Sequence, residues 1–213
     1  MRKILFLMAL CLLLLPLAVT AQVTSVTGNA TVVSPPPSVV ATGTGSESIV
    51  FAEQSGVLSS SISVDASGAG SYGDFGAGSL TPGTIAAGTD VSSFYLHSWD
   101  STDFSGTIYS GSITFATPIL GVEALDASLV ATNSILGVPT TTYYTTEVGQ
   151  GFELFNQIDQ FTISGNTLTY TDATFNASDD LRIITAAPEP SSVLMLGMGL
   201  LTLMVFNLKR LIA

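Results

Sequence analysis

Cysteine is almost absent from this chain, whose single Cys11 lies inside the N-terminal apolar run. The sequence after that run therefore excludes a disulfide framework, a thiolate metal site and a cysteine nucleophile. Cys11 is a poor candidate for lipidation, because Leu10 precedes it where a lipoprotein signal has a small residue. We interpret Cys11 as an apolar residue of a signal peptide.

Basic residues are scarce as well. The chain has five Lys and Arg residues against sixteen acids, and only Arg182 lies away from the two ends. Between Gln22 and Ala187, fifteen acids and one base give a formal net charge of −14. Binding a phosphate backbone requires Lys or Arg side chains that displace its counterions. The sequence therefore excludes a nucleic-acid partner and is typical of a soluble extracellular domain.

Residue types that support catalysis are few. His97 is the only histidine, and no Gly-x-Ser-x-Gly nucleophile elbow occurs. A histidine that ends a strand near Asp100 and Asp103 is more often a structural hydrogen-bond partner than a general base. With fifteen acids in the segment, a glycosidase-like carboxylate pair would arise by chance. We expect no enzyme, no catalytic residue and no required cofactor.

The N-terminus has the order of a secretory signal peptide. Arg2 and Lys3 precede the apolar stretch Ile4–Leu17, and small residues up to Ala21 follow, as a signal peptidase requires. The predicted cut lies between Ala21 and Gln22. The alternative is a first transmembrane helix, but the apolar stretch is shorter than the roughly 20 residues that a bilayer requires.

The C-terminus combines Pro188-Glu189-Pro190, an apolar run and two cations, Lys209 and Arg210. The run predicts a transmembrane helix over residues 193–208. The two cations predict a membrane stop on the cytoplasmic side, so the preceding domain faces outward. Each proline lacks an N–H and restricts its predecessor, so the approach to this helix is extended. An extended segment just outside a membrane is accessible to a processing enzyme.

This tail, residues 188–213, resembles the PEP-CTERM sorting signal. The resemblance implies export by the Sec translocon, a membrane-held intermediate in the inner membrane, and cutting near the motif by an exosortase. It places the mature protein at the cell surface or in the extracellular matrix of a Gram-negative-type bacterium that secretes exopolysaccharide and forms biofilm. The alternative is a plain C-terminal anchor that is never cut.

Between the two ends, the composition favours strands and turns, since Ser, Thr, Gly and β-branched residues dominate and no helical apolar spacing is evident. Around a two-residue Gly165-Asn166 turn, the sequence predicts a β-hairpin over residues 161–170. The predicted pairs are Ile163 with Leu168 and Phe161 with Tyr170 on one face, and Thr162 with Thr169 on the other.

Further short strands predict an all-β fold, a single antiparallel β-sandwich of the jelly-roll kind over residues 47–187. A signal peptide (1–21) and an extended N-terminal arm (22–46) precede this domain. The Gly- and Ser-rich stretch Ala66–Asp90 predicts a long surface loop. The further predicted strands are Ser48–Glu53, Val57–Asp65, Val91–His97, Thr107–Ala116, Ile119–Ala124, Gly151–Asn156 and Leu181–Ala186.

The middle of the chain, roughly residues 91–185, resembles a group of exported PEP-CTERM proteins with no established activity. The chain departs from that group at Ser98-Trp99, where a single aromatic residue is expected between the histidine and the aspartate. The residues that carry the resemblance are Tyr95–His97, Asp100, Gly111–Phe115, Pro118–Val122, Gly151–Leu154, the predicted hairpin, and Asp180–Thr185.

Two binding sites are open alternatives. Hard cations prefer oxygen-rich loops, so calcium is a candidate ligand for acids in turn-like segments, although solvated turn acids explain the same pattern. Exposed aromatic rings could stack on a sugar, which suits a matrix polysaccharide by analogy of fold. The calcium candidates are Asp100, Asp103, Asp179 and Asp180, and the stacking candidates are Trp99, Tyr143 and Tyr144.

Arg182 is the only base of the predicted domain, so we expect it to pair with a carboxylate. Glu153 is the predicted partner, since both residues occur in the resembling segments. Alternation along the strand places Arg182 on the face opposite Leu181 and Ile183.

Taken together, the sequence predicts an exported, non-enzymatic surface or matrix protein, processed by signal peptidase and an exosortase and associated with exopolysaccharide. The alternative is a calcium-assisted carbohydrate-binding module.

Overall fold

The computed structural model describes residues 22–40, 45–73, 80–99, 107–146, 150–152, 158–174 and 178–188, and those up to Ala187 belong to one compact unit. The structure is mostly β-strand. The strands are β1 (Val23–Gly28), β2 (Ala30–Val32), β3 (Ser48–Val57), β4 (Ile62–Val64), β5 (Gly70–Gly73), β6 (Gly83–Ile85), β7 (Asp90–Trp99), β8 (Thr107–Phe115), β9 (Ile119–Glu123), β10 (Gln160–Ser164), β11 (Thr167–Thr174) and β12 (Ser178–Ala186), and the described helix is α2 (Asp126–Leu136).

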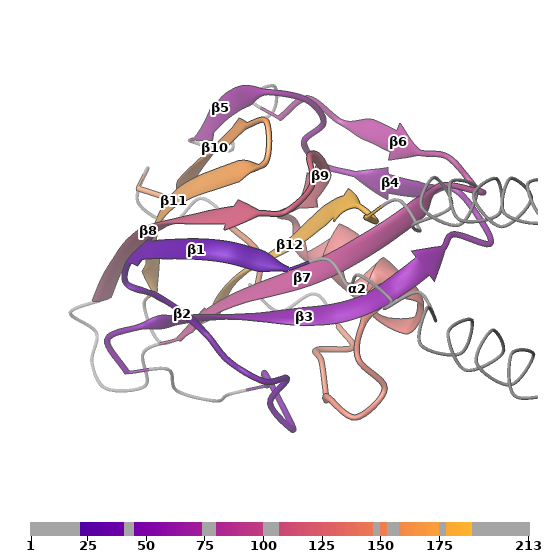
Figure 1. Cartoon of the computed structure of the whole chain (residues 1–213). Coiled ribbons are helices and arrows are strands. Elements are labelled where there is room, and N and C mark those ends of the chain that lie inside the picture. Colours follow the sequence, from indigo (N-terminus) through magenta and orange to yellow (C-terminus); the bar gives the residue numbers. More distant parts are fainter. Residues whose placement is uncertain are drawn as a thin grey trace, which may run out of the picture. The chain divides into compact units, whose positions relative to one another are not determined.

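Two five-stranded sheets form a β-sandwich (Figure 1). The first sheet has the order β1-β8-β11-β10-β5, the second has the order β2-β3-β7-β12-β9, and β4 pairs with β6 in a small third sheet. The main core lies between the two large sheets, where Phe94 of β7 and Phe115 of β8 approach to 4.7 Å between ring centroids. The all-β prediction is confirmed.

The hairpin predicted over residues 161–170 is confirmed in its register. β10 and β11 pair antiparallel, with Phe161 opposite Tyr170, Thr162 opposite Thr169 and Ile163 opposite Leu168. The four apolar side chains are buried in the core, whereas the two threonines face outward. Gly165 has a φ of 63°, the left-handed conformation that a two-residue turn requires.

The N-terminal segment belongs to the sheets and is not the predicted arm outside them. β1 pairs with β8 in the first sheet, and β2 pairs with β3 in the second, the latter in parallel. Gly28, with a φ of 74°, lets the chain turn between β1 and β2, and a Cβ there would lie 2.2 Å from the Ser110 carbonyl oxygen. The sandwich is therefore mixed, and the expectation of antiparallel pairing throughout is wrong.

The loop predicted over Ala66–Asp90 contains two strands, β5 and β6. Tyr72 and Ile85 provide the reason, because each is buried while its neighbours are small or polar. Within the predicted strand Val57–Asp65, only Val57, the last residue of β3, and Ile62–Val64, which form β4, have strand structure. Of the predicted strand Gly151–Asn156, the described residues show a single bridge, from Gly151 to Asp180.

The helix α2 was not predicted. Its buried positions Leu129, Thr132 and Leu136 follow helical spacing, but Thr132 interrupts the apolar pattern. The helix has no side-chain cap of its own at Leu125. Instead, Asp65 accepts hydrogen bonds from the Ala124 N–H at 2.7 Å, the Leu125 N–H at 2.9 Å and the Ser128 hydroxyl at 2.7 Å. This distant carboxylate fixes the chain at the start of the helix, and its bond to the N–H of the N-cap residue Leu125 corresponds to one half of a capping box.

Within the described part of the chain, no helix has the length and hydropathy needed to cross a membrane. The predicted signal peptide and the predicted helix over 193–208 lie outside the described residues, as do Ala21, Glu189, Pro190, Lys209 and Arg210.

Candidate functional site

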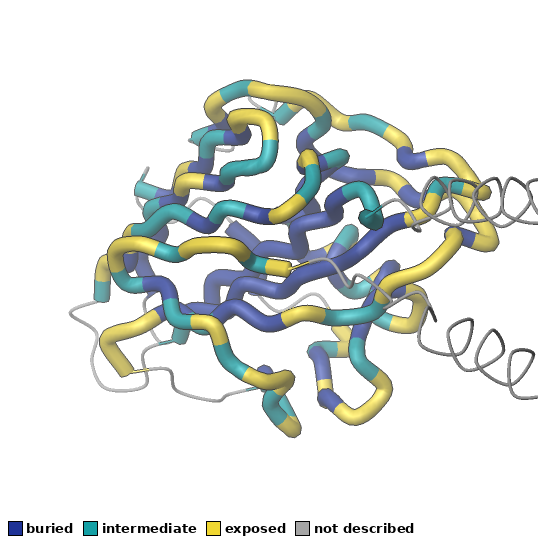
Figure 2. The backbone as a smooth tube through the Cα atoms, viewed as in Figure 1, coloured by how far each residue is buried: buried dark blue, intermediate teal, exposed yellow. Residues whose placement is uncertain are grey.

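Several buried ionisable side chains converge on the second sheet, on the face that α2 covers. Both faces of β7 and β12 are buried (Figure 2), because the core packs on one side and α2 with its neighbours packs on the other. Alternation along β12 sends Leu181 and Ile183 into the main core. It sends Asp180 and Arg182 to the helix-covered face, opposite His97 and Tyr95 of β7.

Arg182 is fully buried, and its guanidinium is surrounded by acceptors. It donates from Nε and Nη2 to both carboxylate oxygens of Glu53, at 2.8 and 3.0 Å. From Nη1 it donates to Glu123 Oε2 at 3.3 Å. Three further acceptors belong to α2: the Leu129 carbonyl oxygen, Thr132 Oγ1 and Asn133 Oδ1.

The expectation that Arg182 pairs with a carboxylate is confirmed, and the carboxylates are those of Glu53 and Glu123. The predicted partner Glu153 lies outside the described residues. Sequence reasoning did not find the pair with Glu53, which lies 129 residues from Arg182 in the chain. One feature of the sequence could have indicated this pair: Glu53 belongs to a strand with apolar and β-branched residues, where an unpaired charge is uncommon.

Two opposing effects set the ionisation of this cluster. Burial raises the pKa of Glu123 to about 7, although the charge of Arg182 and the Thr132 hydrogen bond lower it. Burial lowers the pKa of Arg182, but the adjacent carboxylates outweigh that effect and hold the pKa above its ordinary value. Arg182 therefore stays charged, while Glu123 titrates near neutral pH.

Two tyrosines enclose the guanidinium from the sides. The Arg182 Cζ lies 5.1 Å from the centroid of the Tyr95 ring and 5.6 Å from that of Tyr143, which are cation–π distances. Tyr143 is 8% exposed and its hydroxyl accepts a hydrogen bond from the Val138 N–H. The expectation that Tyr143 is an exposed ring is wrong, because the ring packs against Tyr95 and Arg182. Tyr144 and Trp99 are half-buried.

His97 and Asp180 form a second buried pair next to Arg182. The His97 Nδ1 lies 2.6 Å from Asp180 Oδ1, and the Tyr95 hydroxyl donates to Asp180 Oδ2 at 3.0 Å. Burial raises the pKa of Asp180, and the facing His97 lowers it. All three side chains are fully buried. The structural pairing expected for His97 is present, with Asp180 as the aspartate.

The calcium hypothesis placed Asp179 and Asp180 in a turn, and that placement is wrong. Both lie in β12 and are buried, because β12 is a central strand between β7 and β9. Asp100 and Asp103 lie outside the described residues. Across the described ranges, no group of three or more His, Cys, Asp and Glu side chains has the arrangement of a metal site.

A further buried acid, Asp172, joins the two sheets. The Ser98 hydroxyl of β7 donates to Asp172 Oδ2 of β11 at 2.7 Å, and it lies 2.7 Å from the Ser48 hydroxyl of β3. Burial raises the pKa of Asp172 well above its ordinary value. Sequence reasoning missed this contact because Asp172 sits in an ordinary Thr-rich strand.

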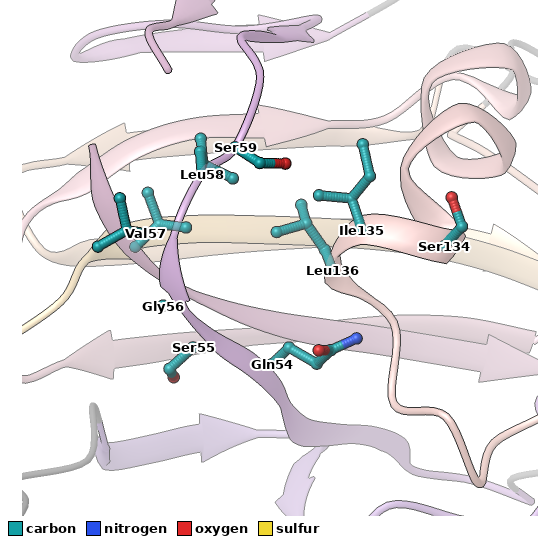
Figure 3. Close-up of a pocket in the computed structure, with 10 residues that line it drawn as sticks. Gln54, Ser55, Gly56, Val57, Leu58, Ser59, Ser134, Ile135 and Leu136 are labelled. Carbon is teal, nitrogen blue, oxygen red and sulfur yellow. The ribbon is translucent and has the colours of Figure 1, made fainter. Parts of the chain in front are cut away.

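A pocket of about 300 Å³ lies between the end of β3 and the end of α2 (Figure 3). Gln54 and Leu58 line one side, and Ser134, Ile135 and Leu136 line the other. A second pocket, of about 290 Å³, lies between β4 and α2. Neither lining includes an ionisable side chain, so neither offers a general acid, a base or an anchor for a charged ligand.

Comparisons of the chain with protein-family models, with curated proteins and with solved structures gave no match. The buried cluster around Arg182 has the geometry of a structural centre that fixes α2 to the second sheet.

Proposed function

We propose that this chain is an exported, non-enzymatic protein of the cell surface or extracellular matrix, released from a membrane-held tail by an exosortase. The observation that carries the proposal is where the fold ends. The Ala186 N–H donates to the Pro118 carbonyl oxygen at 3.0 Å, and the Ala187 N–H donates to that of Asp90 at 3.0 Å. The next residue, Pro188, is the first of the sorting motif.

This junction supports processing without loss of the fold. Every strand that the structure describes ends before Pro188. A cut within Pro188-Glu189-Pro190 therefore removes no described strand or core side chain. In the sequence, the motif follows the last residue of the folded unit directly.

The assignment as non-enzymatic rests on accessibility. His97, Asp180 and Arg182 are fully buried, with His97 paired to Asp180 and Arg182 to Glu53. The two pockets described above contain no ionisable side chain. A jelly-roll-like sandwich, the connectivity that the sequence predicts, is a common scaffold for surface and glycan-associated modules. The partners of this proposal are the Sec translocon, signal peptidase, the exosortase and the matrix polysaccharide.

The proposal is tested by replacing both motif prolines. In the native host, the double variant Pro188→Ala/Pro190→Ala should stay in the membrane fraction, whereas the wild-type chain should reach the surface or the medium. A matched control, Pro35→Ala/Pro37→Ala, changes two exposed prolines elsewhere and should behave as wild type. Equal release of all three proteins would contradict the proposal.

A further inference from the structure

The outward face of the first sheet presents rows of hydroxyl groups. The strand registers place one row across all five strands: Ser71 of β5, Thr162 of β10, Thr169 of β11, Ser112 of β8 and Thr27 of β1. Each of these side chains is exposed or half-buried. We call this surface, with the two rows beside it, the hydroxyl face.

A second row runs beside the first, two residues further along the strands. It consists of Ser164, Thr167, Thr114 and Ser25. A third row on the other side has Gln160, Thr171 and Ser110. Neighbouring strands lie about 4.8 Å apart, and side chains two residues apart on one strand are separated by about 6.8 Å, so the groups form a regular array.

Hydrogen bonds along the rows hold the hydroxyls in place. The oxygens of Ser71 and Thr162 lie 2.9 Å apart, and those of Ser112 and Thr169 lie 3.2 Å apart. In the second row, the Thr114 and Thr167 oxygens are 3.1 Å apart, so one donates to the other. A hydroxyl has one donor and two acceptor sites, so each paired group keeps capacity for a further partner.

The hydroxyl face carries no charge. The only ionisable acid in its five strands is Asp172, which is fully buried on the inner side. This contrasts with the segment as a whole, which has a formal net charge of −14. The tyrosines of these strands, Tyr72, Tyr109 and Tyr170, are also buried and offer no exposed ring.

We propose that the hydroxyl face binds a neutral polysaccharide chain. Each Ser and Thr hydroxyl donates and accepts, as do the hydroxyls of a sugar, so the two surfaces are complementary group by group. An acidic domain repels an anionic polymer, and a face without cations cannot attract one. One hydroxyl pair contributes little, so many sugar units must bind at once. The inference deepens the proposed function, on which it rests, by naming a ligand class and a surface.

The shape of the sheet favours a single polymer chain over a flat crystal face. Strands of a sandwich are twisted, and the strands of this sheet change direction from β1 to β5 (Figure 1). A flexible polymer chain can bend along the twisted array and contact many of its hydroxyls. A planar lattice such as ice can contact only a few of them at once. Trp99 and Tyr144, the other candidates for contact with a sugar, do not belong to the five strands of this face.

The test uses the full chain in a polyoxyethylene detergent, which has no sugar headgroup to compete. Affinity electrophoresis measures its retardation in gels that contain hydroxyethyl cellulose, dextran or mannan, which are neutral, or alginate, which is anionic. We expect retardation by at least one neutral polymer and none by alginate. Glucose or mannose at the same mass concentration should not compete, because a monosaccharide contacts too few hydroxyls.

Variants connect the binding to the face. Thr162→Val/Thr169→Val/Ser112→Ala removes three hydroxyls from the central row. It should weaken binding and raise the apparent Kd by about tenfold or more. The single variant Thr169→Val, at an exposed strand position, should raise the apparent Kd by a smaller factor. It provides a second measurement if the triple variant does not fold. A matched control, Ser63→Ala/Thr84→Val, removes an exposed cross-strand pair from the β4–β6 sheet and should bind as wild type.

Several results would overturn the inference: no retardation by any of the three neutral polymers, equal retardation of the triple variant and the wild type, or retardation by alginate alone. Ice-crystal shaping or dimer formation that depends on these hydroxyls, without glycan binding, would assign the face to another partner and would also overturn it. This test does not require processing of the tail. A failed binding test with a correctly cut tail refutes the hydroxyl face alone, and an uncut tail refutes the sorting proposal alone.

Discussion

Arg182 of β12 reaches across β7 to bind both carboxylate oxygens of Glu53 on β3, at 2.8 and 3.0 Å, and neither side chain is exposed. The same guanidinium bonds to three residues of α2. The only base of the segment Gln22–Ala187 thus joins two strands of a sheet to the helix that covers them.

Replacing Arg182 should destabilise the domain strongly. In Arg182→Met, two buried carboxylates lose their cation, and removal of one partner of a buried pair costs about 3–5 kcal/mol of unfolding free energy. Urea unfolding followed by tryptophan fluorescence measures this loss. Glu47→Gln, which changes an exposed acid, is the control and should change stability by less than about 0.5 kcal/mol. Equal stability of Arg182→Met and the wild type would contradict the structural role.

Stability should fall as the pH rises through the titration range of Glu123. Its pKa is raised from 4.5 to about 7, so the folded state binds this proton more tightly than the unfolded state. The contribution is complete below about pH 4.5 and is lost towards pH 7, in total roughly 3 kcal/mol. Burial raises the pKa of Asp172 and Asp180 as well, and these groups act in the same direction.

The variant Glu123→Gln isolates this effect. Urea unfolding at several pH values between 4.5 and 7 should give a flatter stability profile for Glu123→Gln than for the wild type. Glu47→Gln should leave the profile unchanged. Parallel profiles for wild type and Glu123→Gln would show that Glu123 does not titrate in this range.

Trypsin should cut the folded domain only when it unfolds. Trypsin cleaves after Lys and Arg, and Arg182 is the only such residue between Gln22 and Ala187. It is fully buried, so its peptide bond becomes a substrate through unfolding. Mass spectrometry should detect the product that ends at Arg182 in urea and not in native buffer. Cleavage at the same rate in both conditions would be inconsistent with a buried Arg182.

A glycine in β8 should be intolerant of a side chain. A Cβ at Gly111 would lie 2.6 Å from the Thr27 carbonyl oxygen and 3.1 Å from the Tyr170 ring. Gly111→Ala should therefore separate β1 from β8 and lower the melting temperature, as overpacking typically costs about 1–3 kcal/mol. Ser110→Ala, at the adjacent exposed position, is the control. A melting temperature equal to the wild type would show that β1 adjusts without cost.

The parts of the fold that were predictable from the sequence are those with local signals. The Gly165-Asn166 turn fixes the register of β10 and β11, and the four apolar residues around it confirm one buried face. The strands β7 and β8 were also predicted, because both contain β-branched and aromatic residues. Their partners in the sheets are distant in the chain, since β7 lies between β3 and β12, and β8 lies between β1 and β11.

The remainder depended on distant contacts. Short strands such as β5 and β6 have one large residue each, so only pairing in the folded sheet distinguishes them from loop. The helix α2 uses Thr132 as a buried position because Arg182 and Glu123 bond to it. The sequence alone suggests that Asp180 is a solvated acid in a turn, whereas in the fold it lies in β12 opposite His97 of β7. The positions of these residues are determined by contacts between distant parts of the chain, which a local sequence pattern does not contain.

The most direct test of the sorting account is the intact mass of the protein from the membrane and medium fractions of its native host, with and without the exosortase. We predict a species that begins at Gln22 and ends within Pro188–Pro190, present only in the strain that has the enzyme. A chain that keeps its complete C-terminal tail in both strains would contradict the account.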